Sequence, residues 1–251
     1  MAETLNLGSA PAGFRFERRP AEMRRRLVTL SERTLIARDC VRVRVAGSDL
    51  RGFGANSGID DHVRIFFPGD AASASDPGDW PSREYTPVAW ADDWLDLEFV
   101  LHGSGVASEW AGAAPIGSQV VLGGPRGSVH FSGNPAQWLI AGDESAVAQI
   151  RRYAAAMPPG ADARIVIEVA DSNHEVPVEA PCAITYVHRG TRPPGDALVA
   201  ALRETSPLPR AESFAFVAGE QSVVSPARNL VFDDWGLSDT QAIVKGYWRR
   251  A

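Results

Sequence analysis

Residues 136–160, "AQWLIAGDESAVAQIRRYAAAMPPG", decide which class of fold the chain adopts. They begin with an apolar run, continue through the polar turn "GDES" (142–145) and end in a helical pattern that stops at Pro158. An apolar run of this length is typical of a strand, and prolines followed by glycine are typical of the end of a helix. The stretch therefore predicts a strand, a turn and a helix in succession, which is the repeating unit of a parallel sheet.

The same alternation continues towards the end of the chain. The patterns predict two further apolar strands, a helix, and then a strand followed by a helix, at 163–171, 181–190, 195–206 and 212–236. Strands that alternate with helices form parallel sheets through right-handed crossovers. Residues 136–251 are therefore expected to form an α/β domain with a parallel sheet.

Upstream of residue 136 the pattern is different. Short segments with strand-like alternation, such as Val41, Val43 and Val45, are separated by turn residues; they lie at 24–47, 60–68, 84–90, 94–102 and 118–129. A polar loop rich in proline and glycine lies at 69–82, a short helix is expected at 108–114, and residues 1–20 show no clear pattern. This organisation predicts an antiparallel barrel or sandwich over residues 20–135.

Composition narrows the class of protein. The chain has 251 residues and a net charge of −6, which argues against nucleic acid as the main partner. Its two cysteines are far apart in sequence, so no disulfide framework is expected. There is no signal-peptide pattern, no membrane-spanning run and no obvious interface stripe, so we expect a soluble, cytoplasmic monomer. The basic run at 15–26 is most simply a solvated face.

The segment "REYT" (83–86) places an arginine and a tyrosine on one face of a predicted strand. Arginine offers planar donors for phosphate, and a tyrosine ring can cover a flavin while Thr86 reaches the polar edge of that ring. The alternative is an edge-strand arginine that extends beside an aromatic side chain. The segment by itself does not separate these two interpretations.

A second candidate is "LHGSGVASEWA" (101–111), in which a strand is expected to end at His102. Gly103 and Gly105 allow close backbone approach, and a helix that begins near Ala107 and Ser108 would suit a pyrophosphate. The alternative is an ordinary strand–turn–helix corner with a structural His102. The turn "GGPRGS" (123–128) adds one more arginine, whereas a GxGxxG fingerprint, an HExxH motif and a catalytic triad pattern are absent from the sequence.

Taken in order, these segments resemble the siderophore-interacting, FAD-binding ferric-siderophore reductase family. The resemblance rests on "REYT", on "DDHVRIFFP" (60–68) before it, and on "VLHGSGVASEWA" and "GGPRGS" after it. It continues with "AGDESAVAQI" (141–150), "FVAGE" (216–220) and the terminal "KGYWRR" (245–250), and so covers about residues 20 to 250.

The resemblance implies a fold like that of ferredoxin-NADP reductases, with an FAD-binding antiparallel β-barrel followed by a parallel-sheet α/β domain that faces the electron donor. It implies reduction of a ferric siderophore for intracellular iron release, with electrons from NAD(P)H or a reduced ferredoxin. The implied cofactor-binding residues are Arg83, Tyr85, Thr86, His102, Gly103, Ala107, Ser108, Trp110, Asp143, Glu144 and Ser145. No side chain is expected to act as an acid, base or nucleophile, because the cofactor carries the chemistry.

Three alternatives remain open from the residues. Asp143 and Glu144 could cap a helix rather than contact a cofactor. In the terminal segment, Lys245, Trp248, Arg249 and Arg250 are expected to bind the anionic siderophore complex, although a basic aromatic run is also typical of a helix end. The chain as a whole could be a general NAD(P)H-flavin oxidoreductase with another acceptor, or a module that binds a siderophore without reducing it.

Overall fold

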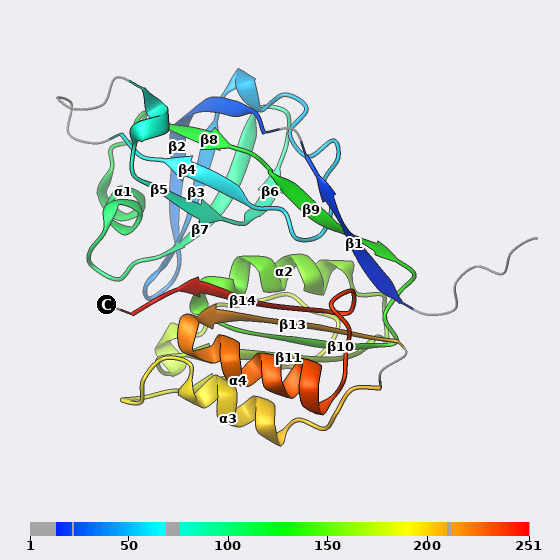
Figure 1. The fold of residues 1–251 in the computed structure, drawn as a ribbon. Helices are drawn as coiled ribbons and strands as arrows, with labels where there is room; N and C mark the ends of the chain where they lie inside the picture. The colour runs from blue at the N-terminus through cyan, green and yellow to red at the C-terminus, as the bar shows by residue number, and fades with distance from the viewer. Residues whose placement is uncertain (1–13, 22, 69–75, 210–211, 251) are drawn as a thin grey trace, which may run out of the picture.

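The computed structural model describes residues 14–21, 23–68, 76–209 and 212–250. In this part of the chain the strands form a seven-stranded antiparallel sheet, a two-stranded ribbon and a five-stranded parallel sheet (Figure 1). The antiparallel strands are β2 (Arg25–Ala37), β3 (Cys40–Ala46), β4 (Val63–Phe66), β5 (Ser82–Tyr85), β6 (Pro87–Trp90), β7 (Trp94–Val100) and β8 (Gln119–Gly123). The ribbon pairs β1 (Arg15–Pro20) with β9 (Gly127–Ser132).

The parallel sheet has the order β12-β11-β10-β13-β14 and begins with the strand predicted at 136–142. Its strands are β10 (Gln137–Asp143), β11 (Asp162–Val169), β12 (Ile184–His188), β13 (Ser213–Glu220) and β14 (Ala242–Trp248). The helices are α1 (Val106–Ala113), α2 (Val147–Ala156), α3 (Asp196–Glu204) and α4 (Val224–Arg228), with a π-helical turn over Asn229–Asp234. Short 3₁₀ turns lie at Ser48–Leu50, Pro77–Asp79, Glu144–Ala146, Ser172–His174 and Gln221–Val223.

The antiparallel sheet curls into a barrel because its two edge strands are consecutive in sequence. β5 and β6 lie at opposite ends of the order β5-β4-β8-β2-β3-β7-β6, yet only Thr86 separates them. A single residue spans less than 4 Å, so the two edges must approach each other at Thr86. The predicted strand at 84–90 is therefore wrong as one element, since the chain changes strands within it.

Helix α2 and the ribbon β1–β9 connect the barrel with the parallel sheet. Helix α2 lies between the barrel and the parallel sheet, whereas α3 and α4 cover the opposite face of that sheet (Figure 1). Phe14 and Phe16 before and within β1 pack with Trp138 and Phe214 of the parallel sheet. The ribbon β1–β9 therefore extends the core of the α/β half, although the sequence showed no clear pattern before residue 20.

The fold class predicted from the sequence is confirmed: antiparallel barrel first, parallel α/β sheet second, in the manner of ferredoxin-NADP reductases. The antiparallel strands end at Ser132 and the parallel ones begin at Gln137. The terminal basic run is not a helix end, because Lys245 and Trp248 belong to the edge strand β14. Within the described ranges no helix is both long and apolar enough to cross a membrane.

Candidate functional site

The REYT segment, residues 83–86, lies where the barrel closes between β5 and β6. Arg83 pairs with Ile65 and Tyr85 pairs with Val63 across the β4–β5 ladder. Cross-strand partners share a face of a sheet, so Arg83 and Tyr85 lie on the face where Val63 and Ile65 are fully buried. The shared face expected from strand alternation is therefore confirmed.

The Tyr85 side chain packs against the protein, whereas Arg83 is exposed. The Tyr85 ring packs on Phe99 at a centroid distance of 4.2 Å, and burial raises the pKa of its phenol. The exposed Arg83 donates one hydrogen bond within the described residues, from Nη1 to the carbonyl oxygen of Ser82 at 2.8 Å. Most of the guanidinium donors of Arg83 therefore remain available to an anion.

The segment 102–110 forms the corner between β7 and α1. Gly103 and Gly105 have positive φ angles of 80° and 87°, which other residues rarely adopt, and a Cβ atom at Gly103 would meet open space. The Ser108 hydroxyl accepts a hydrogen bond from the backbone N–H of His102 at 3.1 Å and so closes the turn. The Glu109 carboxylate accepts from the N–H of Gly105, which satisfies one donor at the start of α1.

Two residues of this corner belong to the barrel core instead. Ala107 and Trp110 are buried, and the Trp110 ring packs against Phe67 and Phe99 at 5.5 and 6.0 Å. The Trp110 Nε1 is buried without a partner in the described part of the chain. These contacts mean that Ala107 and Trp110 seat the helix, while Gly103 and the exposed His102 form its outer surface.

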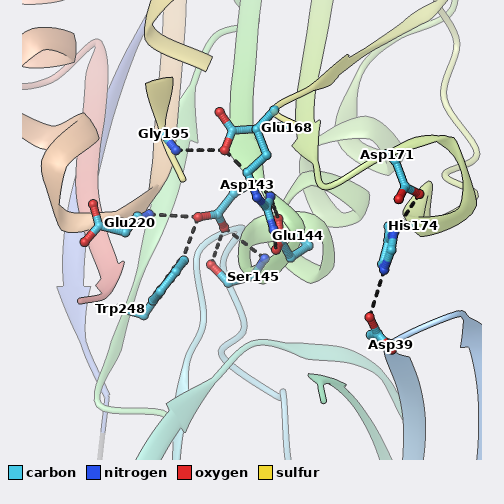
Figure 2. Close-up of polar contacts among 11 residues, drawn as sticks. Asp39, Asp143, Glu144, Ser145, Glu168, Asp171, His174, Gly195, Glu220 and Trp248 are labelled. Carbon is cyan, nitrogen blue, oxygen red and sulfur yellow. Dashed lines mark hydrogen bonds and ion pairs between the residues drawn. The ribbon is translucent and has the colours of Figure 1, made fainter. Parts of the chain in front are cut away.

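The GDES turn, residues 142–145, follows the central strand β10. The Asp143 carboxylate caps the 3₁₀ turn after that strand, because its Oδ1 accepts from the N–H and the hydroxyl of Ser145 at 2.9 and 2.5 Å. The capping role weighed from the sequence is thus present. Glu144 forms a two-pronged ion pair with Arg189 at 2.6 and 2.8 Å (Figure 2 shows the neighbourhood of this turn).

The terminal segment, residues 245–250, reaches both halves of the molecule. The Lys245 ammonium forms an ion pair with Asp60 of the barrel at 2.5 Å. The phenol of Tyr247 lies against the Thr86 side chain. The Trp248 indole donates to Asp143 Oδ2 at 2.8 Å. The fold therefore brings the terminal segment to the REYT segment and to the GDES turn at once.

Comparisons with known proteins agree with this arrangement. Residues 135–251 match the model of the siderophore-interacting protein family, and residues 29–129 match that of the siderophore-interacting FAD-binding domain. The ferric vibriobactin reductase ViuB of Vibrio cholerae is 30% identical over 245 residues, which cover 90% of this chain and 89% of ViuB. The chain belongs to the siderophore-interacting protein family.

Solved structures give the same result for the fold. A siderophore utilization protein from T. fusca superposes with a TM-score of 0.83 at 27% identity, covering 94% of this chain and 96% of that one. The cytochrome b5 reductase domain of nitrate reductase from Ulva prolifera superposes with a TM-score of 0.65 at 14% identity, covering 88% of this chain and 96% of that one. The second likeness concerns the fold alone.

The residues of the barrel fit the FAD expected of this family. Among the described residues Arg83 leaves most of its cationic donors unpaired, which suits a pyrophosphate, and the Tyr85 ring lies on the same face. The open space and positive φ at Gly103 leave room for close backbone approach at the start of α1. Arg83, Tyr85, Thr86 and the 102–108 corner would therefore hold the cofactor, which remains a prediction for each of these residues.

The other predicted site residues are more heavily engaged. Asp143 accepts hydrogen bonds from Ser145, Glu144 is paired with Arg189, and Lys245 is paired with Asp60. By contrast, Arg249 and Arg250 have exposed side chains. Their predicted roles, in contact with the electron donor or the siderophore, remain predictions.

Sequence reasoning missed three groups that organise this region. Asp60 pairs with Lys245, the backbone N–H of Glu220 donates to Asp143, and Arg189 pairs with Glu144. Two of them stood in segments that were already noticed, "DDHVRIFFP" and "FVAGE". The sequence did not indicate that these segments meet, because a contact between residues as far apart as 60 and 245 leaves no pattern in the neighbouring residues.

Proposed function

We propose that the protein is an FAD-dependent reductase of ferric siderophores, with NAD(P)H or a reduced ferredoxin as electron donor. The observation that carries this proposal is the contact between Tyr247 and Thr86, which joins the terminal strand to the REYT segment of the FAD-binding domain. The exposed Arg249 and Arg250 lie two and three residues after Tyr247, so this contact brings them near the cofactor motif. A basic rim beside a redox cofactor suits an anionic ferric complex.

When bound, FAD supplies the electron transfer between the donor and Fe(III). The chain itself binds and orients: Arg83 meets the negative charge of the cofactor, and the Tyr85 ring provides an aromatic surface beside it. Arg249 and Arg250 attract the ferric complex without enclosing it. One electron converts Fe(III) to Fe(II), which the hard oxygen ligands of a siderophore hold less tightly, so the iron leaves.

The first experiment records the visible spectrum of the purified protein and then adds NADH, NADPH or reduced ferredoxin under anaerobic conditions. A ferric tris-catecholate complex and a coloured Fe(II) chelator follow. We expect flavin absorption that bleaches with one of the donors and recovers as chelated Fe(II) appears. Bleaching without Fe(II) would favour a flavin oxidoreductase with another acceptor, and a protein that takes up no FAD would favour a siderophore-binding module.

A paired substitution tests the basic rim. Replacing both Arg249 and Arg250 with Gln should raise the KM for the ferric complex by roughly three- to tenfold, because exposed charges each contribute about 0.2–1 kcal/mol. The difference should shrink as salt is added. Arg203→Gln is the matched control, since Arg203 is also exposed but lies on α3, across the parallel sheet. An equal KM for the double variant and the control would contradict a siderophore site at this rim.

A further inference from the structure

The carboxylate of Asp143 is fully buried and accepts more hydrogen bonds than a helix cap requires. Its Oδ1 serves the Ser145 cap, whereas its Oδ2 accepts from the backbone N–H of Glu220 and from the Trp248 indole, both at 2.8 Å (Figure 2). Asp143 is the last residue of β10, and the two donors to its Oδ2 come from the ends of β13 and β14, so three neighbouring strands of the parallel sheet meet here. The carboxylate therefore ties together the ends of three strands.

The surrounding backbone is shaped to admit this carboxylate. A Cβ atom at Gly219 would lie 2.7 Å from Asp143 Oδ2, closer than real Cβ contacts allow. Gly219 therefore leaves the space that the carboxylate occupies, in the strand β13 beside it. The same position begins the irregularity that follows in the β13–β14 ladder.

Strand β14 leaves its regular ladder at this point. Gly219 pairs with Gly246, but the next pair joins Glu220 to Trp248, so that Tyr247 is the extra residue of a bulge. A bulge interrupts pairing and redirects the side chains around it. The end of β14 is consequently held by side chains: Trp248 on Asp143, Tyr247 on Thr86, and the backbone N–H of Arg250 on the Glu220 carboxylate.

We propose that Asp143 is a positioning residue: through the Trp248 indole it fixes the end of β14, which keeps Tyr247 against Thr86 and aims the basic residues 249–250 at the FAD motif. In this role Asp143 acts through Trp248 rather than through contact with cofactor or substrate. The proposed effect on iron reduction rests on the proposed function. The effect on Trp248 does not, because it follows from the contact alone.

The charge of Asp143 is expected to change within an accessible pH range. Burial, and then the nearby Glu144 charge, raise the pKa of Asp143 to about 6, while the hydrogen bonds from Ser145 and Trp248 oppose this shift. A neutral carboxyl is a weaker acceptor than a carboxylate, so the bond from Trp248 should weaken as Asp143 takes up a proton. The ionisable residues next to Asp143 on its own turn and on the neighbouring elements are Glu144, Glu168, Arg189, Tyr247 and Glu220, the last through its backbone N–H.

The direct test observes the indole N–H groups by ¹H–¹⁵N NMR of the full chain labelled at tryptophan. The chain has seven tryptophans, and Trp248→Phe assigns the signal of Trp248. We expect that signal to move with pH with a midpoint near 6, while the other indole signals hold their positions. A Trp248 signal that does not respond between pH 5 and 8 would overturn the proposal, and this measurement needs no change at Asp143.

Asp143→Asn provides the second measurement. Both oxygens of Asp143 accept from N–H donors, so an amide nitrogen in either orientation leaves a donor unpaired. We expect a shifted Trp248 signal that no longer titrates. Glu168→Gln is the matched control, because Glu168 is a fully buried carboxylate that accepts from the N–H groups of Gly195 and Leu198 but not from Trp248. Loss of the titration in both variants would contradict a specific role of Asp143.

Turnover of the ferric tris-catecholate complex separates this proposal from the function on which it rests. Asp143→Asn and Trp248→Phe should each raise the KM by roughly three- to tenfold with kcat nearly unchanged, and the double variant should be no worse than the singles. Additive effects would contradict action through Trp248. If the wild-type protein reduces no ferric complex, the proposed function fails, and the indole spectra still decide the role of Asp143.

Discussion

The REYT segment and the GDES turn were both predicted to bind a cofactor, FAD at the first and the electron donor at the second, but their polar groups are engaged to different extents by the protein. At the REYT segment, Arg83 lies exposed and donates a single hydrogen bond within the described part of the chain. At the GDES turn, Asp143 is fully buried and each of its oxygens accepts two hydrogen bonds. Residue type and position in a motif therefore do not distinguish a group that is available to a ligand from one whose hydrogen bonds are already made within the protein.

The largest effect is expected from the unsatisfied side of this comparison. Arg83→Ala should weaken FAD binding roughly 10- to 100-fold, because charge-assisted hydrogen bonds contribute about 1.5–3 kcal/mol. Titration of the apoprotein with FAD, followed by flavin fluorescence, measures this change. Arg64→Ala is the control, since Arg64 lies on the neighbouring strand but its guanidinium is paired with Glu84 at 2.7 Å. Equal losses in the two variants would remove the distinction drawn for Arg83.

A smaller effect, on stability instead of binding, is expected at the satisfied side. Glu144→Gln removes the shorter of the two ion pairs of Arg189, and the Glu144 and Arg189 side chains are largely buried, at 19% and 14% exposure. The free energy of unfolding should fall by about 1–3 kcal/mol, since the buried Arg189 charge then keeps only the longer pair with Glu168, at 3.7 Å. Chemical denaturation measures this loss, with Glu175→Gln, from the more exposed pair with His188, as the control.

The same variant can also reverse the interpretation of the GDES turn. If Glu144→Gln unfolds like the wild type but shows a higher KM for NADH or NADPH, Glu144 contacts the donor as the family resemblance implied. If it loses stability while the FAD affinity is unchanged, Glu144 is a structural partner of Arg189. Either result decides whether Glu144 binds the electron donor or serves the fold.

The smallest effect is expected at a bridge between the barrel and the α/β half of the molecule. The His174 imidazole contacts Asp171 at 2.7 Å through Nδ1 and Asp39 of the barrel at 2.9 Å through Nε2 (Figure 2). His174→Gln removes both contacts and should therefore lower Tm by about 1–2 °C at pH 7. An unchanged Tm would contradict a stabilising bridge.

The Asp171 carboxylate makes the stabilisation by this bridge depend on pH. The hydrogen bond from His174, followed by that from the N–H of Asn173, holds the pKa of Asp171 below its usual value. A lowered pKa stabilises the folded state at pH values above the ordinary carboxyl pKa, and this stabilisation is lost as pH falls through the lowered value. Thermal unfolding between pH 3 and 5 should show the His174→Gln difference disappearing as the pH falls.

Several elements of the fold could be predicted from local pattern alone. The strand, turn and helix at 136–160 are present as β10, the GDES turn and α2, because apolar periodicity and the Pro-Pro-Gly stop act within a few residues of chain. The strand at 84–90 could not be predicted correctly, because Thr86 joins the two edges of the barrel and only closure of the sheet separates β5 from β6. Strand β14 was not recognised either, because its pairing partner β13 ends more than twenty residues before it.

The sequence by itself determined the order of the two sheets, the family of the protein and the segments that gather at its candidate site. These properties depend on residue type and on spacing within short windows, which survive without knowledge of distant contacts. Only the tertiary structure decided which of the candidate residues are free. Hydrogen bonds from Trp248 and Glu220 to Asp143 span 105 and 77 residues, and burial at that point depends on three strands meeting. A carboxylate in a motif is a potential acceptor, and its surroundings decide whether a ligand or the protein itself supplies the donors.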